Sequence, residues 1–184
     1  EYALLPNKQL YPIETDLDWA TLAALPETYY TAFGSMLNLK IAKDDKVLVR
    51  AGISGVGVAF VKLLKAKYPD IYVAGSSRSL KKEKQMLDVG YDEAIIDQDG
   101  ELQTDKKFDK ILELIGPKTI KNSFKHLIEG GIVCSTGQLG NQWYLDKFDP
   151  IIDIAANSYL TSFYSGNVNE EKINHMLDYV KKYD

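Results

Sequence analysis

The sequence has few of the residues that disulfide frameworks and metal centres need. Its 184 residues include one cysteine, Cys134, and two histidines, His126 and His175. A single cysteine excludes an internal disulfide framework, and the three residues together are too few for a cysteine-rich structural zinc site. The low cysteine content fits a reducing compartment, so we expect a cytoplasmic protein.

The sequence also has no surplus of positive charge and no long apolar run. The formal net charge is −4 and the isoelectric point is about 5.3, whereas binding of nucleic-acid phosphates needs a basic surface. No apolar run reaches the roughly 20 residues of a membrane span, and residues 1–3 do not open a signal peptide. We therefore expect neither a nucleic acid nor a membrane as partner.

What the sequence does contain is an alternation of apolar runs and amphipathic segments. Residues 1–17 form a proline-punctuated lead-in, Asp18 is a plausible N-cap, and Pro26 suits the first turn of a second helix. The later runs are almost continuously Val, Ile and Leu, which predicts a parallel sheet with helices on both faces. The predicted strands are 46–51, 71–76, 93–97, 110–115, 131–136 and 158–165, and the helices that follow from residue 57 are 57–67, 81–89, 119–128 and 170–183.

A glycine-rich loop joins the first predicted strand to its helix. It reads GISGVG over residues 52–57 and follows the fingerprint G-x-G-x-x-G except for a serine in the middle. The first glycine would permit the turn out of the strand, the last would let the helix pack closely on the sheet, and the helix N-terminus would receive a pyrophosphate. A corner without any ligand, or a loop closed by the serine, is the alternative. The candidate binding residues are Gly52, Ser54, Gly55, Val56 and Gly57.

The end of the second predicted strand indicates which dinucleotide would bind. An NAD site places an acidic residue roughly 20 residues beyond the last glycine, but the sequence has Ser76 and Ser77 there, followed by Arg78 and Lys82. Hydroxyl groups and cations suit a 2′-phosphate, so we expect NADP(H) rather than NAD(H). The alternative is an exposed basic first turn of a helix, although cations there oppose the helix dipole.

Several segments in one order resemble the medium-chain dehydrogenase/reductase superfamily, and within it the zinc-free, quinone-oxidoreductase-like branch. They are AALPETYYTAFGSM, VLVRAGISGVG, SSRSLKK, VGYDEAIID, FDKILELIG, LIEGGIVCSTG, TGQLGNQWYLDKF and YLTSFYSG. The resemblance implies an α/β fold with a doubly wound, six-stranded parallel sheet (a Rossmann fold) in the order 3-2-1-4-5-6. Residues 18–184 would be its NADP-binding domain, and residues 1–17 a linker from an N-terminal substrate domain outside this sequence.

The resemblance implies an NADPH-dependent oxidoreductase that transfers hydride to a quinone, enone or related carbonyl acceptor. This chain alone would bind cofactor but be inactive, and no catalytic residue can be named. Thr31 would lie near the nicotinamide, unless its hydroxyl bonds to its own helical turn. The loops at Ile115-Gly116 and Thr136-Gly137 would flank the cofactor path, unless they are ordinary turns. The strand in 158–166 would pair two chains into a homodimer.

Other classes of function are less consistent with the sequence. Glu27 stands where zinc-dependent members of the superfamily carry a cysteine ligand, so we expect no zinc, with a zinc-dependent alcohol dehydrogenase relative as the alternative. None of the twelve tyrosines has a lysine four residues later, which excludes a short-chain reductase. A methyltransferase would need an acidic residue at the end of the second predicted strand to bind the ribose, and Ser76 and Ser77 stand there instead. A nucleotide-binding or structural protein that kept the fold and lost catalysis stays open.

The remaining candidates for chemistry have simpler interpretations. Cys134 lies inside a predicted strand and is expected in the core. His126 and His175 fall on predicted amphipathic helices and are expected near solvent. Trp143 and Tyr144 would cover either the nicotinamide or a subunit contact.

Overall fold

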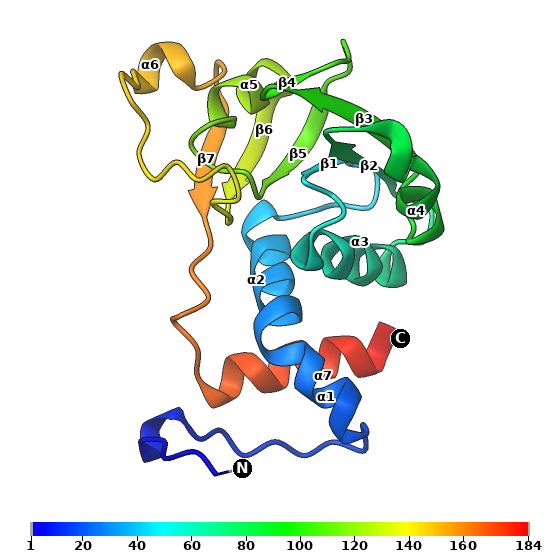
Figure 1. Cartoon of the computed structure of the whole chain (residues 1–184), viewed down its shortest axis with the longest axis vertical. Coiled ribbons are helices and arrows are strands. Elements are labelled where there is room, and N and C mark those ends of the chain that lie inside the picture. Colours follow the sequence, from blue (N-terminus) through cyan, green and yellow to red (C-terminus); the bar gives the residue numbers. More distant parts are fainter. Residues whose placement is uncertain (1, 184) are drawn as a thin grey trace.

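Seven strands form one sheet in the computed structural model, which describes residues 2–183 (Figure 1). The order across the sheet is β4-β3-β2-β1-β5-β6-β7, and every neighbouring pair is parallel except β3 and β4. The strands are β1 (Lys46–Arg50), β2 (Tyr72–Ser77), β3 (Glu93–Gln98), β4 (Glu101–Leu102), β5 (Phe108–Glu113), β6 (Leu127–Ser135) and β7 (Tyr159–Ser162).

All six predicted strands are present in the predicted order, and β4 is the addition. The sheet is therefore seven-stranded and mixed, not six-stranded and wholly parallel. Asp99 and Gly100 turn the chain from β3 into β4 with φ of 53° and 92°. Two consecutive positive φ values are typical of the two-residue hairpin turn that Asp-Gly favours. The Asp-Gly pair carried this signal, but a two-residue strand has no pattern of its own.

The helices are α1 (Trp19–Ala24), α2 (Tyr30–Leu39), α3 (Gly55–Lys67), α4 (Glu83–Asp88), α5 (Ile120–Lys125), α6 (Pro150–Asp153) and α7 (Glu170–Tyr183), with short turns η1 (Asn7–Gln9), η2 (Leu25–Tyr29) and η3 (Leu80–Lys82). Asp18 caps α1 as predicted, since its Oδ1 accepts from the backbone N–H of Ala20 at 2.9 Å. Pro26 does not start a separate helix. It lies in the wide turn η2, which carries α1 directly into α2.

Two predicted boundaries are wrong for a physical reason that the register shows. Helix α5 ends at Lys125 rather than at 128, because Leu127 already pairs with Phe108 in the ladder between β6 and β5. Strand β7 is shorter than predicted and ends at Ser162, where its pairing with Ser135 of β6 also ends. Helix α7 begins and ends where the sequence predicted.

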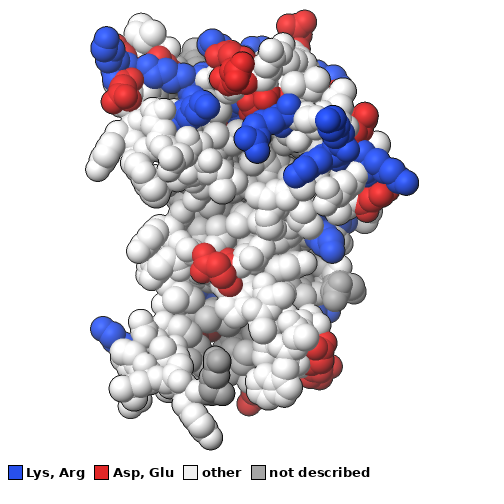
Figure 2. Space-filling view, in the orientation of Figure 1, with Lys and Arg blue, Asp and Glu red and all other residues white. Residues whose placement is uncertain are grey.

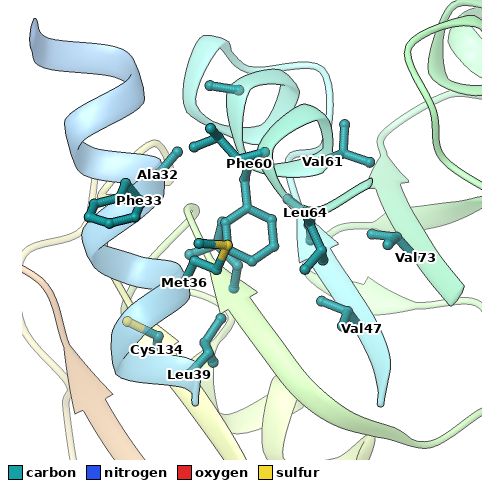
Figure 3. Packing of buried hydrophobic residues seen from close by; sticks show 14 of the residues in the cluster. Ala32, Phe33, Met36, Leu39, Val47, Phe60, Val61, Leu64, Val73 and Cys134 are labelled. Carbon is teal, nitrogen blue, oxygen red and sulfur yellow. The ribbon is translucent and has the colours of Figure 1, made fainter. Parts of the chain in front are cut away.

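Helices cover both faces of the sheet, as the almost continuously apolar strands predicted. On one face, Phe60 and Leu64 of α3 and Leu39 of α2 pack with Val47 and Val73 (Figure 3). Helix α7 joins this side through Met176, Leu177 and Tyr179. On the other face, Ile120 and Phe124 of α5 pack with Leu48, Ile111 and Val133. Alternate residues of β1 thus enter different cores, which fixes the strand in its register.

Candidate functional site

A cleft of about 650 Å³ opens at the carboxyl ends of β1, β2 and β3. Doubly wound sheets bind their ligands at this edge. Six of the predicted binding residues line the cleft: Ser54, Ser76, Ser77, Arg78, Lys82 and Ile115. The wall also contains Asp97, Asp99, Gly100, Lys118, Thr119, Leu139 and Gly140, none of which was predicted from the sequence. The other predicted residues lie outside the lining of the cleft.

The glycine loop makes its turn one residue earlier than predicted. Ala51 takes φ of 59°, whereas Gly52 has no positive φ. Gly52 is instead needed for close packing, because an added Cβ would lie 3.2 Å from the Cα of Gly75. Gly57 has the predicted role, since a Cβ there would lie only 2.7 Å from the carbonyl oxygen of Gly52. Helix α3 therefore packs against the loop itself, and it starts at Gly55 rather than at Gly57.

Ser54 is the N-cap of α3. Its Oγ accepts a hydrogen bond from the backbone N–H of Gly57 at 3.2 Å, so the serine that stands in place of a glycine pairs one of the donors at the start of the helix. Within residues 2–183, no group accepts from the backbone N–H of Gly55 or Val56. These two donors lie at the positive end of a 13-residue helix, which is a favourable place for a phosphate.

The end of β2 divides the four predicted phosphate ligands into two kinds. Ser76 is fully buried, and its Oγ accepts from the N–H of Ala51 at 3.2 Å, so it braces the glycine loop. Ser77 donates to the carbonyl of Ser79 at 3.2 Å. Arg78 and Lys82 are exposed, and no group in the described chain pairs with either charge. In the view of Figure 2, Lys and Arg side chains gather on the upper part of the molecule.

A buried arginine that was not predicted as a site residue ties the walls of the cleft together. Arg50, the last residue of β1, is fully buried. Its Nη2 donates to Asp97 Oδ2 at 2.5 Å and to the carbonyl of Gly100 at 3.1 Å. Its Nη1 reaches α5 and the residue before it, at the carbonyl of Thr119 (3.2 Å), Asn122 Oδ1 (2.8 Å) and Ser123 Oγ (3.2 Å). A charge at the end of an apolar strand was the available signal, because buried arginines need partners.

Glu113, at the end of β5, holds the loop that contains Ile115 and Gly116. Its Oε1 accepts from both of their N–H groups, at 2.9 Å and 3.0 Å, and from Thr119 Oγ1 at 2.9 Å. Gly116 has φ of 92°, and an added Cβ would lie 2.6 Å from the carbonyl oxygen of Gly137. Gly116 and Gly137 thus allow two loops to touch beside the cleft, and neither lines it.

Thr31 carries a buried hydroxyl without a hydrogen-bond partner, the only such side-chain atom among residues 2–183. The alternative that this hydroxyl bonds to its own helical turn is therefore wrong. It is Ser35 Oγ that donates to the carbonyl of Thr31, at 2.7 Å, and it also lies 2.9 Å from Thr136 Oγ1. Thr31 and Thr136 are thereby brought together, and an unpaired buried hydroxyl is costly until a ligand satisfies it.

Comparison with known proteins identifies relatives in sequence and neighbours in fold. No protein-family model matches the sequence. Quinone oxidoreductase from Rattus norvegicus is 30% identical over 149 residues, which cover 77% of this chain and 45% of the rat protein. These similarities confirm the resemblance to the quinone-oxidoreductase-like branch of the medium-chain dehydrogenase/reductase superfamily. It spans about half the length of the curated quinone oxidoreductases that it matches.

Solved structures share the fold of this chain. The YhdH structure of E. coli K-12 with bound NADPH superposes with a TM-score of 0.81 at 18% identity, over 97% of this chain and 56% of that chain. The quinone oxidoreductase of Thermus thermophilus, described with its NADPH complex, gives 0.70 at 21% identity, over 95% of this chain and 57% of that chain. At these identities the likeness establishes the fold alone.

The remaining candidates from the sequence do not line the cleft. Cys134 is buried as predicted, and burial raises the pKa of its thiol. His175 is exposed as predicted, but His126 is not: it is 9% exposed, and burial lowers its pKa. Trp143 and Tyr144 are exposed beside β7 and line a separate groove. Within residues 2–183, no group of acidic, cysteine and histidine side chains could hold a metal ion, and no helix could span a membrane.

Proposed function

We propose that this chain is the cofactor-binding domain of an NADPH-dependent oxidoreductase that transfers hydride to a quinone, enone or related carbonyl acceptor. The observation that carries the proposal is the pair of unpartnered cations, Arg78 and Lys82, in a cleft at the carboxyl edge of the sheet. An NAD-specific site would place an acidic residue there. The rat relative and the Thermus thermophilus neighbour are named quinone oxidoreductases, and both structural neighbours are described with NADPH, which supports the proposal.

The residues present fit NADPH, some in the lining of the cleft and others, Gly55, Val56 and Thr31, outside it. The free N–H groups of Gly55 and Val56 would hold the pyrophosphate at the start of α3. Arg78 and Lys82, with the Ser77 hydroxyl, would hold the 2′-phosphate. The unpaired hydroxyl of Thr31 would receive a polar group of the nicotinamide.

The bound cofactor supplies the hydride, and this chain binds it, orients it and keeps water from it. We assign no proton donor, in keeping with the sequence. We propose that the chain alone binds NADPH but has no robust reductase activity, because it spans 45% of the rat relative. Turnover of a quinone or enone by this chain alone would contradict that part of the proposal.

Calorimetric titration of the chain with NADPH and, in parallel, with NADH tests the proposed function. We expect saturable binding of NADPH and clearly weaker binding of NADH, because only NADPH carries the 2′-phosphate. Equal affinities would leave Arg78 and Lys82 without the proposed role. Absence of binding by either cofactor would contradict the proposal as a whole.

We also propose that no zinc is bound. Glu27, which occupies the position of the cysteine ligand in zinc-dependent members, is an exposed residue of the wide turn η2. An exposed carboxylate keeps its hydration and needs no metal to compensate its charge. Metal analysis of the purified protein tests this, and stoichiometric zinc that survives dialysis would contradict it.

For assembly we propose a homodimer through the edge strand in 158–166. Within residues 2–183, β6 is the one strand that pairs with β7, so the other edge of β7 has no strand beside it. The segment carries large exposed side chains, with Tyr159 at 62%, Leu160 at 37% and Tyr164 at 78% exposure. An apolar open edge favours pairing with another chain. Light scattering should give twice the chain mass, and a monomer at high concentration would contradict the proposal.

A further inference from the structure

Asp97 presents one carboxylate oxygen to the cleft. The residue lines the cleft at the carboxyl end of β3 and is otherwise buried. Its Oδ2 accepts from Arg50 Nη2 at 2.5 Å and from Nε at 3.1 Å. No group within residues 2–183 donates to its Oδ1, and this atom is not among the fully enclosed side-chain atoms without a partner. Oδ1 is therefore a free acceptor at the cleft surface.

The arginine explains how a carboxylate can stand in a cleft that would bind phosphates. Arg50 is fully buried directly behind Asp97, so its charge compensates that of Asp97 from the protein side. Arg78 and Lys82 keep their charges for an anionic ligand. Arg50 is held in turn by its hydrogen bonds to Gly100 and to the start of α5, so the carboxylate cannot swing away. Asp97 is thus a fixed hydrogen-bond acceptor whose charge Arg50 compensates in part, since Arg50 Nε also lies 3.9 Å from Glu113 Oε2.

The register of the sheet places this acceptor beside the proposed 2′-phosphate site. Ser77 at the end of β2 pairs with Ile96 of β3, so Asp97 comes one residue later at the same edge. Strand β3 lies on the side of β2 away from β1 and the glycine loop, about 4.8 Å further out. A dinucleotide with its pyrophosphate at α3 and its 2′-phosphate at Arg78 therefore has its base next to Asp97.

The carboxylate of Asp97 can bind adenine only through a hydrogen-bond donor of the base. The hydrogens of the exocyclic amine are the donors that the base offers, and its ring nitrogens accept. We propose that Asp97 Oδ1 accepts a hydrogen bond from the adenine amino group, so that the chain selects an adenine over a hypoxanthine dinucleotide. This inference rests on the proposed function, because it requires NADPH in the cleft.

The test compares two ligands on the unaltered chain. Calorimetry compares NADPH with reduced nicotinamide hypoxanthine dinucleotide phosphate, in which a carbonyl oxygen replaces the amino group and the neighbouring ring nitrogen N1 changes from an acceptor into an N–H donor. We expect the hypoxanthine form to bind at least about tenfold more weakly, the size expected for a hydrogen bond to a charged group. Equal affinities would overturn the inference and leave the proposed function standing. If NADPH itself did not bind, both would fall.

A matched pair of variants assigns the selectivity to one carboxylate. In Asp97→Asn, the amide oxygen would stay with Arg50 and the amide N–H₂ would face the cleft, which should abolish or reverse the preference for NADPH. Asp99→Asn makes the same change at an exposed residue of the same cleft and should keep the preference. Full preference in Asp97→Asn, or its loss in Asp99→Asn, would overturn the assignment. If Asp97→Asn does not fold, the affinities of the two dinucleotides for the unaltered chain and for Asp99→Asn decide whether the inference holds.

Discussion

The two arginines at the carboxyl edge of the sheet have opposite surroundings. Arg50 is fully buried and donates to groups from β3, from the turn after it and from α5. Arg78, at the end of the neighbouring strand β2, is exposed in the cleft and has no partner in the described chain. The same side chain therefore serves as a structural clamp at one strand end and as an open binding group at the next.

The difference shows how a binding cleft can be recognised before any ligand is seen. Buried charges must be compensated within the fold, because an isolated buried ion is very costly. A charge that stays unpaired in a cleft loses nothing in the free protein and gains on binding an anion. Hence the hydrogen-bond partners of Arg50 are part of the fold, whereas the unpaired charge of Arg78 indicates that the cleft binds an anion.

The largest expected effect is a loss of stability when Arg50 is replaced. Arg50→Met should lower the free energy of unfolding by about 3–5 kcal/mol, because it leaves the buried carboxylates of Asp97 and Glu113 without their cation. Arg78→Met is the matched control and should change stability by less than about 0.5 kcal/mol. Urea unfolding of both variants measures the difference, and equal losses would break the comparison between the two arginines.

The second effect is on binding. Replacing Arg78 and Lys82 by alanine together should weaken NADPH by about ten- to a hundredfold through the loss of charge-assisted hydrogen bonds, with little change for NADH. Lys43→Ala removes an exposed lysine before β1, at the opposite edge of the sheet, and should leave both affinities unchanged. Calorimetry on the three proteins decides. A parallel loss of NADH binding would show that these cations hold something other than the 2′-phosphate.

The sequence predicted the exposed binding group, Arg78, better than the buried one, Arg50. Arg78 and Lys82 could be found by counting along the chain from Gly57, because the fingerprint fixes the distance to the end of the second strand. The sheet order followed from the family resemblance, and the apolar runs that are buried on both faces agreed with it. Arg50 meets Asp97 and Asn122 across 47 and 72 positions in the sequence, and no local pattern specifies such contacts.

Local backbone detail was the other part that the sequence could not supply. The sharp turn falls on Ala51 rather than on Gly52, because Gly52 is needed where the loop touches Gly75. His126 was expected near solvent on a longer helix, but β6 begins at Leu127 and draws the histidine against the carbonyl of Lys106, 3.2 Å from its Nδ1. In both cases tertiary packing overrides the local preference of the residue.

A third prediction extends the comparison from arginines to hydroxyls. Tyr91 lies buried under the glycine loop, and its hydroxyl is 3.0 Å from the carbonyl oxygen of Gly52 and 2.8 Å from that of Gly57. Tyr91→Phe should cost about 1–2 kcal/mol of stability, because it leaves these buried acceptors without their donor. Thr31→Val removes the hydroxyl that has no partner and should cost nothing. Thermal or urea unfolding compares the two, and a larger loss in Thr31→Val would contradict the distinction.

The smallest expected effect concerns the pH dependence of stability. Burial lowers the pKa of His126, and the nearby cations Lys107 and Arg50 act in the same direction. The unfolded chain, with the ordinary histidine pKa of about 6.5, then binds a proton more readily than the folded chain. Stability should thus be highest above that pH and fall as the pH drops through it.

His126→Gln should remove this part of the pH dependence, while His175→Gln, at the exposed histidine, should retain it. Urea unfolding between about pH 5 and 8, the range in which histidine titrates, measures both variants. An unchanged pH profile in His126→Gln would show that a lowered pKa of His126 does not contribute to the pH dependence of stability. A reduced slope would show that the buried imidazole contributes to the pH dependence of stability, with burial as its main cause.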